Sequence, residues 1–251
     1  VFSDFDGTIF LQDTGHILFD HHGCGVDTRK KLDSQIGTGE RSFRSVSEEL
    51  WASLDIPLEQ GFETMQKYLV MDEGFVSFVQ YCFDNNIPFN VISAGIKPLL
   101  RHVLDEFLGK EMSSQIGIIS NDADIVQVAE EDGQKKYQWK PIWRHDTELG
   151  HDKAQSIQEF REHTTEEIKE ADANDPSGPT YEELGIEESP LIIFIGDGVS
   201  DLPAAREADV LFARRGLLLE QYCIKNNLPY IPYDSFVDIQ RDVEDIINRE
   251  R

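Results

Sequence analysis

The sequence is poor in cysteine, in basic residues and in long apolar runs. Its three cysteines, Cys24, Cys82 and Cys223, are far apart, odd in number and not spaced like metal ligands. This pattern argues against a disulfide framework and favours free thiols in a reducing compartment, so we expect a cytoplasmic protein. No apolar run approaches the roughly 18 residues of a membrane span, and no secretory signal is visible.

Basic residues are outnumbered two to one. There are 23 Lys and Arg against 48 Asp and Glu, which gives a formal net charge of −25. Nucleic acids and anionic membrane surfaces both reward basic patches, so we expect neither as a partner. An anionic small molecule would have to be attracted by local positive charge against this overall field. The 251 residues, 39% of them hydrophobic, are enough for one well-packed domain or for a core with a smaller insert.

The segment 1–8 reads as a short apolar strand that runs directly into polar residues. Asp4 and Asp6 are two residues apart, a spacing that places both side chains on the same side of a regular strand. Gly7 allows a sharp turn after them. Two adjacent carboxylates form a costly anionic patch that a cation can neutralise, and such hard oxygen ligands suit Mg²⁺. An isolated Asp-x-Asp-Gly is equally compatible with a strand that simply ends in a polar turn.

Beyond this strand the pattern predicts a helical insert and then alternating helices and strands. Residues 13–73 show helical spacing without strand signals, whereas 1–12 and 74–251 are expected to form the core. Residues 162–189 are acidic and interrupted by Pro and Gly, and we expect a surface insertion within the core. The elements expected in the core are helices near 75–83, 97–107, 152–160, 202–208, 217–226 and 236–247, strands at 87–92, 116–119, 191–195, 210–213 and 230–231, and a hairpin around 125–139.

Strand–helix alternation with continuously apolar strands predicts an α/β fold with a Rossmann-like open parallel sheet. Three of the expected strands end in polar clusters, namely Asp4 with Asp6, Ser93, and Asp197 with Asp201. Ligands bind at the carboxyl ends of the strands in such sheets, so the clusters are expected to converge on one crevice.

These clusters, taken in order with a lysine between the second and third, resemble the four motifs of the haloacid dehalogenase superfamily. The matching segments are 4–8 (DFDGT), 91–95 (VISAG), Lys153 and 196–201 (GDGVSD). The helical insert resembles the small cap of the phosphoserine phosphatase-like branch. Within that branch, the segments around 73–75, 87–89 and 201–214 look most similar to the methionine-salvage phosphatases that act on a ketopentenyl phosphate.

The resemblance implies roles for individual residues. Asp4 would attack phosphorus and form an aspartyl-phosphate. Asp6 would protonate the leaving alcohol and then activate water. Lys153 would offset the developing charge; Lys140 is the competing candidate for this motif position. Mg²⁺, the expected cofactor, would bind Asp4, the backbone carbonyl of Asp6, and Asp197.

The remaining motif residues would bind phosphate or support the site. Ser93, with the backbone N–H groups of Ala94 and Gly95, would hold the phosphate. Gly7 would shape the loop beside it. Asp201 would orient Lys153 or bind a metal-bound water, although a residue at this position can also serve only as a helix cap.

Two residues of the insert are weaker candidates for substrate contact. Asp13 could bind a substrate hydroxyl or amine, or only cap the first insert helix. Arg44 could bind a second anionic group, although it does not align cleanly with the cap arginine of phosphoserine enzymes. The seven histidines have no ligand spacing, and we expect them to be surface or packing residues.

The resemblance therefore implies a Mg²⁺-dependent phosphomonoesterase for a small soluble phosphate ester. Polyol or sugar phosphates, a methionine-salvage intermediate, phosphoserine and phosphocholine-like esters all stay open. A phosphomutase or other phosphotransferase is the alternative among enzymes, and a regulatory protein on a phosphatase fold is the alternative outside them. The sequence predicts no oligomeric state.

Overall fold

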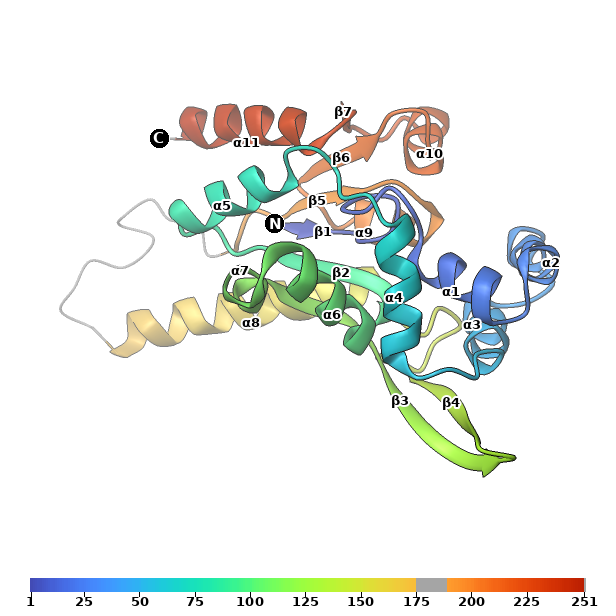
Figure 1. Ribbon diagram of the computed structural model, residues 1–251. Helices are drawn as coiled ribbons and strands as arrows, with labels where there is room; N and C mark the ends of the chain where they lie inside the picture. The colour runs from blue at the N-terminus through green and yellow to red at the C-terminus, as the bar shows by residue number, and fades with distance from the viewer. Residues whose placement is uncertain (175–188, 251) are drawn as a thin grey trace.

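The computed structural model describes residues 1–174 and 189–250 and has an α/β architecture (Figure 1). Within these residues, seven strands form one sheet in the order β4-β3-β2-β1-β5-β6-β7. Neighbouring strands are parallel except β3 and β4, which pair antiparallel. The expected parallel α/β fold is confirmed. In chain order the strands are β1 (Phe2–Ser3), β2 (Asn90–Ile96), β3 (Gly117–Glu131), β4 (Gln134–Ile142), β5 (Ile193–Gly196), β6 (Val210–Arg214) and β7 (Ile231–Tyr233).

Short buried strands form the centre of the sheet. Every residue of β5 is buried, as expected for a parallel strand that is covered on both faces. Ser3 of β1 pairs with Val91 of β2 on one side and with Ile195 of β5 on the other. The residues that follow these three positions therefore emerge at the same edge of the sheet.

Helices cover both faces of the sheet through two separate apolar clusters. One cluster holds α5, α6 and α11 against the sheet, and Phe75 of α5 meets Phe236 of α11 edge to face with ring centroids 5.0 Å apart. The other cluster includes Ile157, Ala204 and Leu219, which come from α8, α9 and α10. The helices of the two layers are α5 (Phe75–Asp84), α6 (Lys97–Leu108), α8 (Lys153–Asn174), α9 (Leu202–Ala205), α10 (Leu218–Asn226) and α11 (Phe236–Glu250), with α7 (Lys110–Gln115) beside α6.

The helices between β1 and β2 form the expected cap, although the last of them, α5, packs against α11. Two short linkers connect the cap to the core and lie side by side. Leu11 N donates to Val70 O at 2.9 Å, and Asp72 N donates to Ile9 O at 2.8 Å. The division of the chain at residues 13 and 73 stays a prediction. The other cap helices are α1 (Thr14–His22), α2 (Val26–Gly37), α3 (Phe43–Ala52) and α4 (Leu58–Tyr68).

A long hairpin extends from the sheet beside the cap (Figure 1). Strand β3 continues for 15 residues, so it joins the strand expected at 116–119 to the expected hairpin. Asp132 and Gly133, at φ 50° and 76°, form the turn, and this conformation matches the twist of paired strands. Trp139 of β4 stacks on Trp51 of the cap and donates its indole N–H to Ile56 O at 2.7 Å. The hairpin thereby becomes part of the cap's support.

Helix α8 is longer than the sequence pattern predicts. It continues through Asn174, so the first part of the predicted acidic insertion is helical, and residues 175–188 lie outside the described residues. The three cysteines are free, as predicted. Within the described ranges, none of the helices combines the length and the apolar character that a membrane crossing requires.

Candidate active site

Asp4 lies at the end of β1, fixed to the strands around it. It is buried, and its backbone N–H donates to Ile195 O of β5 at 2.8 Å. Its Oδ1 accepts the Phe5 N–H at 2.7 Å and lies 2.8 Å from Lys153 Nζ. Both of these contacts are made by Oδ1, and Asp4 also lines the cavity described below.

Lys153, the first residue of α8, is fully buried between two carboxylates. Its Nζ lies 2.8 Å from Asp4 Oδ1 and 2.7 Å from Asp201 Oδ1. Burial alone would lower the pKa of Lys153, but the charges of Asp201 and Asp4 raise it above its ordinary value. Asp201 is in turn fixed through Oδ2, which accepts the backbone N–H groups of Asp197 and Gly198 at 2.9 and 3.0 Å. The ammonium is therefore charged, and its position is fixed by Asp4 and by Asp201, which is itself held by two backbone N–H groups.

Asp197 adds a third carboxylate beside the two that contact Lys153. Oxygens of Asp4, Asp197 and Asp201 lie within 4.8 Å of one another. Burial and the charge of Asp201 raise the pKa of Asp4, and the same two causes raise the pKa of Asp197 to about 6. The cluster therefore carries excess negative charge and offers hard oxygen donors, which fits Mg²⁺. Both oxygens of Asp201 already accept hydrogen bonds, so Asp4 and Asp197 are the better ligands.

Gly7 is required by the close approach of Asp197. It has a φ of +78°, and a Cβ at this position would lie 2.4 Å from Asp197 Oδ2. The next residue, Thr8, donates its hydroxyl to Asp197 Oδ1 at 2.8 Å. Only glycine adopts this positive φ readily and also leaves room for the Asp197 carboxylate. The loop after β1 and the loop after β5 are therefore in direct contact.

Ser93, Ala94 and Gly95 form a bulge near the end of β2. The β2–β3 register shifts between Ile92 and Ile96, which leaves these three residues opposite a single residue of β3. Ser93 Oγ accepts the Gly95 N–H at 3.0 Å. A bulge re-aims backbone groups and is common beside active sites. All three residues line the same cavity as Asp4.

Asp6 and Asp13 lie where the core meets the first cap helix. Asp6 Oδ1 accepts the Thr14 N–H at 2.7 Å, and burial, followed by the charge of Asp13, raises the pKa of Asp6 to about 8. Asp13 is the N-cap of α1, accepts the His16 N–H at 2.8 Å and also lines the cavity. The two alternatives considered for Asp13 are therefore compatible with each other.

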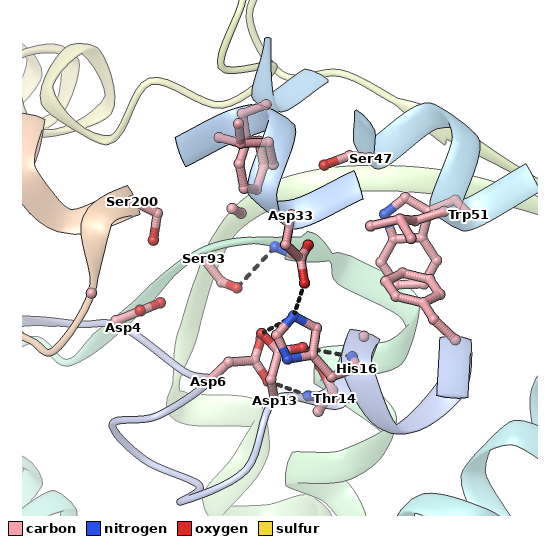
Figure 2. A pocket seen from close by; sticks show the side chains of 18 of the residues that line it. Asp4, Asp6, Asp13, Thr14, His16, Asp33, Ser47, Trp51, Ser93 and Ser200 are labelled. Carbon is pink, nitrogen blue, oxygen red and sulfur yellow. Dashed lines mark hydrogen bonds and ion pairs between the residues drawn. The ribbon is translucent and has the colours of Figure 1, made fainter. Parts of the chain in front are cut away.

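The cavity between cap and core has a volume of about 220 Å³, which suits a small metabolite. Figure 2 shows Asp4, Ser93 and Ser200 on one side and Ser47 and Trp51 of α3 on the opposite side. Asp33 of α2 projects between them toward His16, with Oδ2 3.7 Å from His16 Nε2. The full lining is Asp4, Asp6, Asp13, Thr14, Gly15, His16, Phe19, Asp33, Ile36, Phe43, Ser47, Leu50, Trp51, Ser93, Ala94, Gly95, Asp197, Gly198 and Ser200.

Of the predicted substrate-binding residues, Ser93, Ala94, Gly95 and Asp13 line this cavity, whereas Gly7 and Arg44 do not. Gly7 lies beside it against Asp197, but Arg44 lies elsewhere. It lies in a separate surface hollow on the far side of α3. Its Nη1 is 2.8 Å from Asp146 Oδ1, its guanidinium is 5.7 Å from the centre of the Trp143 ring, and its backbone N–H donates to Glu148 O at 2.9 Å. In this arrangement Arg44 joins the cap to the loop that precedes α8.

Several residues near the site were not singled out from the sequence. His16 and Asp33 lie on different cap helices, so no local pattern connects them. Ser200 falls inside the motif at 196–201 but was not given a role. His151 and Asn121 are both buried behind the bulge of β2, where only the tertiary fold could place them. The sequence predicts that every histidine is a surface or packing residue; of the seven, His16 lines the cavity and His151 is packed behind the bulge.

Comparison with known sequences identifies relatives over the whole chain. The family model described as haloacid dehalogenase-like hydrolase matches residues 1–206. The polyol phosphate phosphatase PYP1 of Saccharomyces cerevisiae is 32% identical over 100% of this chain and 95% of its own length. The 2-hydroxy-3-keto-5-methylthiopentenyl-1-phosphate phosphatase of Bacillus cytotoxicus is 26% identical over 98% of this chain and 96% of its own length. The polyol enzyme is thus more similar to this chain than the methionine-salvage enzyme that the sequence motifs brought forward.

Comparison with solved structures agrees with the fold. A substrate-bound phosphoserine phosphatase superposes with a TM-score of 0.61 over 96% of this chain and 95% of its own, at 14% sequence identity. At that identity the likeness concerns the architecture, namely a parallel sheet with a helical cap between its first two strands in the chain.

Proposed function

This chain belongs to the haloacid dehalogenase-like hydrolases, and from that membership we propose that it is a Mg²⁺-dependent phosphomonoesterase for small polyol phosphates. It is an enzyme of the phosphatase type. The observation that carries the mechanism is that Asp4, Asp6 and Asp197 line one cavity, with the buried ammonium of Lys153 in contact with Asp4. The observation that carries the substrate class is the negative charge of the cap wall, by which we mean the cavity residues that come from the cap, among them Asp13 and Asp33.

The reaction proceeds in two steps through Asp4. Asp4 Oδ2 attacks phosphorus, the bond from phosphorus to the ester oxygen breaks, and Asp6 gives that oxygen its proton. The raised pKa of Asp6 keeps this proton available near neutral pH. Asp6 then accepts a proton from water as the water oxygen attacks phosphorus, which releases phosphate and restores the Asp4 carboxylate. Lys153 stays charged throughout and offsets the charge that builds on the phosphoryl oxygens.

Asp4, Asp197 and the Asp6 backbone carbonyl would hold Mg²⁺. When bound, the ion supplies positive charge against the phosphoryl oxygens and lowers the repulsion between the carboxylates. The three-carboxylate cluster with one ammonium supports this assignment, because its excess charge requires such a counterion.

The cap wall favours a hydroxyl-rich substrate without a second negative charge. None of the described residues that line the cavity is Lys or Arg, whereas Asp13 and Asp33 both lie on the cap side. Carboxylates accept hydrogen bonds from substrate hydroxyls but repel a substrate carboxylate or a second phosphate. Ser47 adds a further hydrogen-bonding group, and Trp51 offers an apolar surface for C–H groups. The similarity to a polyol phosphate phosphatase points the same way.

A phosphate-release assay tests the proposal. The panel contains glycerol 1-phosphate, a hexitol phosphate and 3-phosphoglycerate, which has a carboxylate and no ammonium, first with Mg²⁺ and then with EDTA. We expect release only with Mg²⁺, with kcat/KM for the polyol phosphates at least roughly tenfold above that for 3-phosphoglycerate, which is what one unfavourable charge contact costs. Asp4→Asn should release no phosphate, whereas Asp27→Asn, on an exposed part of α2, should match the wild type.

The assay can contradict the substrate class and the phosphatase activity separately. A preference for 3-phosphoglycerate would overturn the substrate class and leave the phosphatase assignment in place. A folded protein that releases phosphate from none of the esters would overturn the phosphatase proposal itself. Transfer of the phosphoryl group to an added polyol instead of water would support the phosphotransferase alternative.

A further inference from the structure

A buried histidine lies directly behind the phosphate-binding bulge. His151 is 3% exposed, and its Nδ1 lies 2.6 Å from the carbonyl oxygen of Ser93. On the other side of the ring, Nε2 lies 2.9 Å from Ser156 Oγ on α8. Both ring nitrogens therefore have a defined partner, and neither faces the cavity where chemistry takes place.

The Ser93 carbonyl sets the direction of these hydrogen bonds, and the contacts of Ser156 are compatible with it. Arg144 Nε lies 3.0 Å from Ser156 Oγ and, as part of a guanidinium, can only donate. Ser156 Oγ therefore accepts from Arg144, and its own proton is available to a second partner. The Ser93 carbonyl at the opposite end can only accept, so Nδ1 carries a proton. In a neutral ring Nε2 is then an acceptor, and Ser156 donates its hydroxyl proton to it. Burial, together with the charge of Lys153, lowers the pKa of His151 to about 3, which agrees with a neutral ring.

The bulge explains why this carbonyl needs a donor from outside the sheet. The register shift between Ile92 and Ile96 takes Ser93 out of the β2–β3 ladder, and a buried carbonyl without a partner is costly. The neighbouring carbonyl is held in the same way, because Asn121 Nδ2 donates to Ala94 O at 2.9 Å. Two side chains thus replace the ladder across the bulge.

The orientation of the Ser93 carbonyl decides where the next N–H points. A peptide unit is planar, and in the trans form its C=O and N–H point in opposite directions. With the Ser93 carbonyl turned toward His151, the Ala94 N–H points away from His151, and Ala94 lines the cavity. His151 is also two residues before Lys153, so the same short segment fixes the phosphate loop and the catalytic ammonium.

We propose that His151, as the neutral tautomer with its proton on Nδ1, is a positioning residue that aims the Ser93–Ala94 peptide at the transferring phosphoryl group. The proposal rests on the phosphatase function proposed above. His151 neither donates nor accepts a proton during the reaction, and its contribution is the fixed direction of the Ala94 N–H and of the Ser93 hydroxyl.

The test compares two substitutions of similar size. In His151→Asn the side-chain amide can still donate to the Ser93 carbonyl, whereas in His151→Leu nothing can. We expect His151→Leu to lower kcat/KM by about 10- to 100-fold, less than the 10²–10³-fold loss of an entire oxyanion donor, with most of the fall in kcat. We expect His151→Asn to recover activity to within about fivefold of the wild type. The inhibition constant of orthovanadate should rise in His151→Leu and return in His151→Asn, because a misdirected donor weakens binding of a phosphoryl mimic.

The outcomes separate positioning from other roles. Wild-type rates in both variants would overturn the proposal, as would equal losses in both, since the latter would mean that the imidazole itself takes part in proton transfer. His163→Leu, at an exposed position of α8, is the matched control for the replacement of a histidine by leucine away from the bulge. If the wild type released no phosphate at all, the phosphatase proposal would fail, which is distinguishable from a failure of this one.

The tautomer can be measured without any substitution, which keeps the proposal testable if His151→Leu does not fold. Two-dimensional ¹⁵N–¹H correlation spectra of the imidazole rings distinguish Nδ1–H, Nε2–H and imidazolium forms. We expect one ring to remain in the Nδ1–H form from pH 8 down to pH 5, and its signals should disappear in His151→Asn. A His151 ring in the Nε2–H form, or one that titrates near its ordinary pKa, would overturn the proposal.

Discussion

Lys153 is fully buried and pairs with two carboxylates. Its charge therefore contributes both to the stability of the fold and to the proposed reaction. Removing the ammonium leaves Asp4 and Asp201 facing each other without a counter-charge. Breaking a buried ion pair in this way typically costs about 3–5 kcal/mol of stability, and the transition state also loses a preorganised charge.

We therefore expect Lys153→Met to lower kcat by roughly 10³-fold or more and to lower the free energy of unfolding. Phosphate release and urea unfolding monitored by circular dichroism would measure the two effects. Lys140→Met is the matched control, because Lys140 lies exposed on β4 and is the other lysine that the sequence put forward for this role. If Lys140→Met lost activity and Lys153→Met kept it, the assignment of the motif lysine would be reversed.

His151 should also make stability depend on pH. Its pKa is about 3 in the folded protein, below the ordinary value of 6.5. Between these values the unfolded state binds a proton that the folded state does not, so stability falls as the pH drops below about 6.5, by about 1.4 kcal/mol per pH unit for this group. Urea unfolding at pH 7 and pH 5 should show a smaller acid-induced loss in His151→Asn than in the wild type, by up to about 2 kcal/mol. Equal losses in both proteins would contradict this.

The residues that sequence reasoning placed well are those whose position follows from the strand before them. Asp4, Ser93 and Asp197 each follow a buried apolar strand, and parallel strands bring their ends together. His151 and Asn121 could not be found in this way, because their role depends on a bulge that no local pattern announces. Arg44 is the opposite case. Its charge suggested that it binds a ligand, but in the structure its guanidinium pairs with Asp146, away from the cavity.

At the scale of elements, one arginine connects three segments that the chain keeps far apart. Arg214, at the end of β6, donates through Nη2 to Thr8 O at 2.8 Å and to Asp72 Oδ2 at 2.6 Å. Asp72 Oδ1 accepts the Phe236 N–H at 2.7 Å and so fixes the start of α11. Thr8 and Asp72 lie at the two linkers to the cap, so this buried pair sets where both linkers leave the core.

We expect Arg214→Met to lower the free energy of unfolding by about 3–5 kcal/mol, because Asp72 would remain buried without its partner. The neighbouring ion pair of Arg215 with Asp234 is largely exposed, so Arg215→Met should cost at most about 1 kcal/mol. Urea unfolding of both variants measures the difference. Equal costs would show that the Arg214 pair does not hold the linkers.

Element types were easier to predict than element lengths. The alternation of apolar strands and amphipathic helices predicts the parallel sheet, whereas the order of its strands is known only from the structure. The extent of β3 and of α8 could not be read in the same way. The long β3 strand is supported by Trp139 against the cap, and that support comes from residues distant in the chain.

At the scale of the whole molecule, the net charge of −25 acts on every incoming phosphate ester. Salt screens such long-range repulsion, because the Debye length falls from about 30 Å at 0.01 M to about 8 Å at 0.15 M ionic strength. We expect kcat/KM to rise roughly twofold or more over this range at constant free Mg²⁺, with most of the change in KM. Steady-state rates in increasing NaCl would show it, and a decrease with salt would mean that local positive charge already dominates the approach.

The adjacent linkers of the cap have a consequence for how this protein can change over time. Residues 9–12 and 70–72 leave and re-enter the core next to each other, joined by backbone hydrogen bonds. The segment between the two linkers therefore begins and ends at neighbouring points of the core. Another segment whose ends are equally close could replace it without altering the register of β1 and β2. A new specificity could be acquired by exchange of one insert, while the residues that perform the chemistry keep their positions.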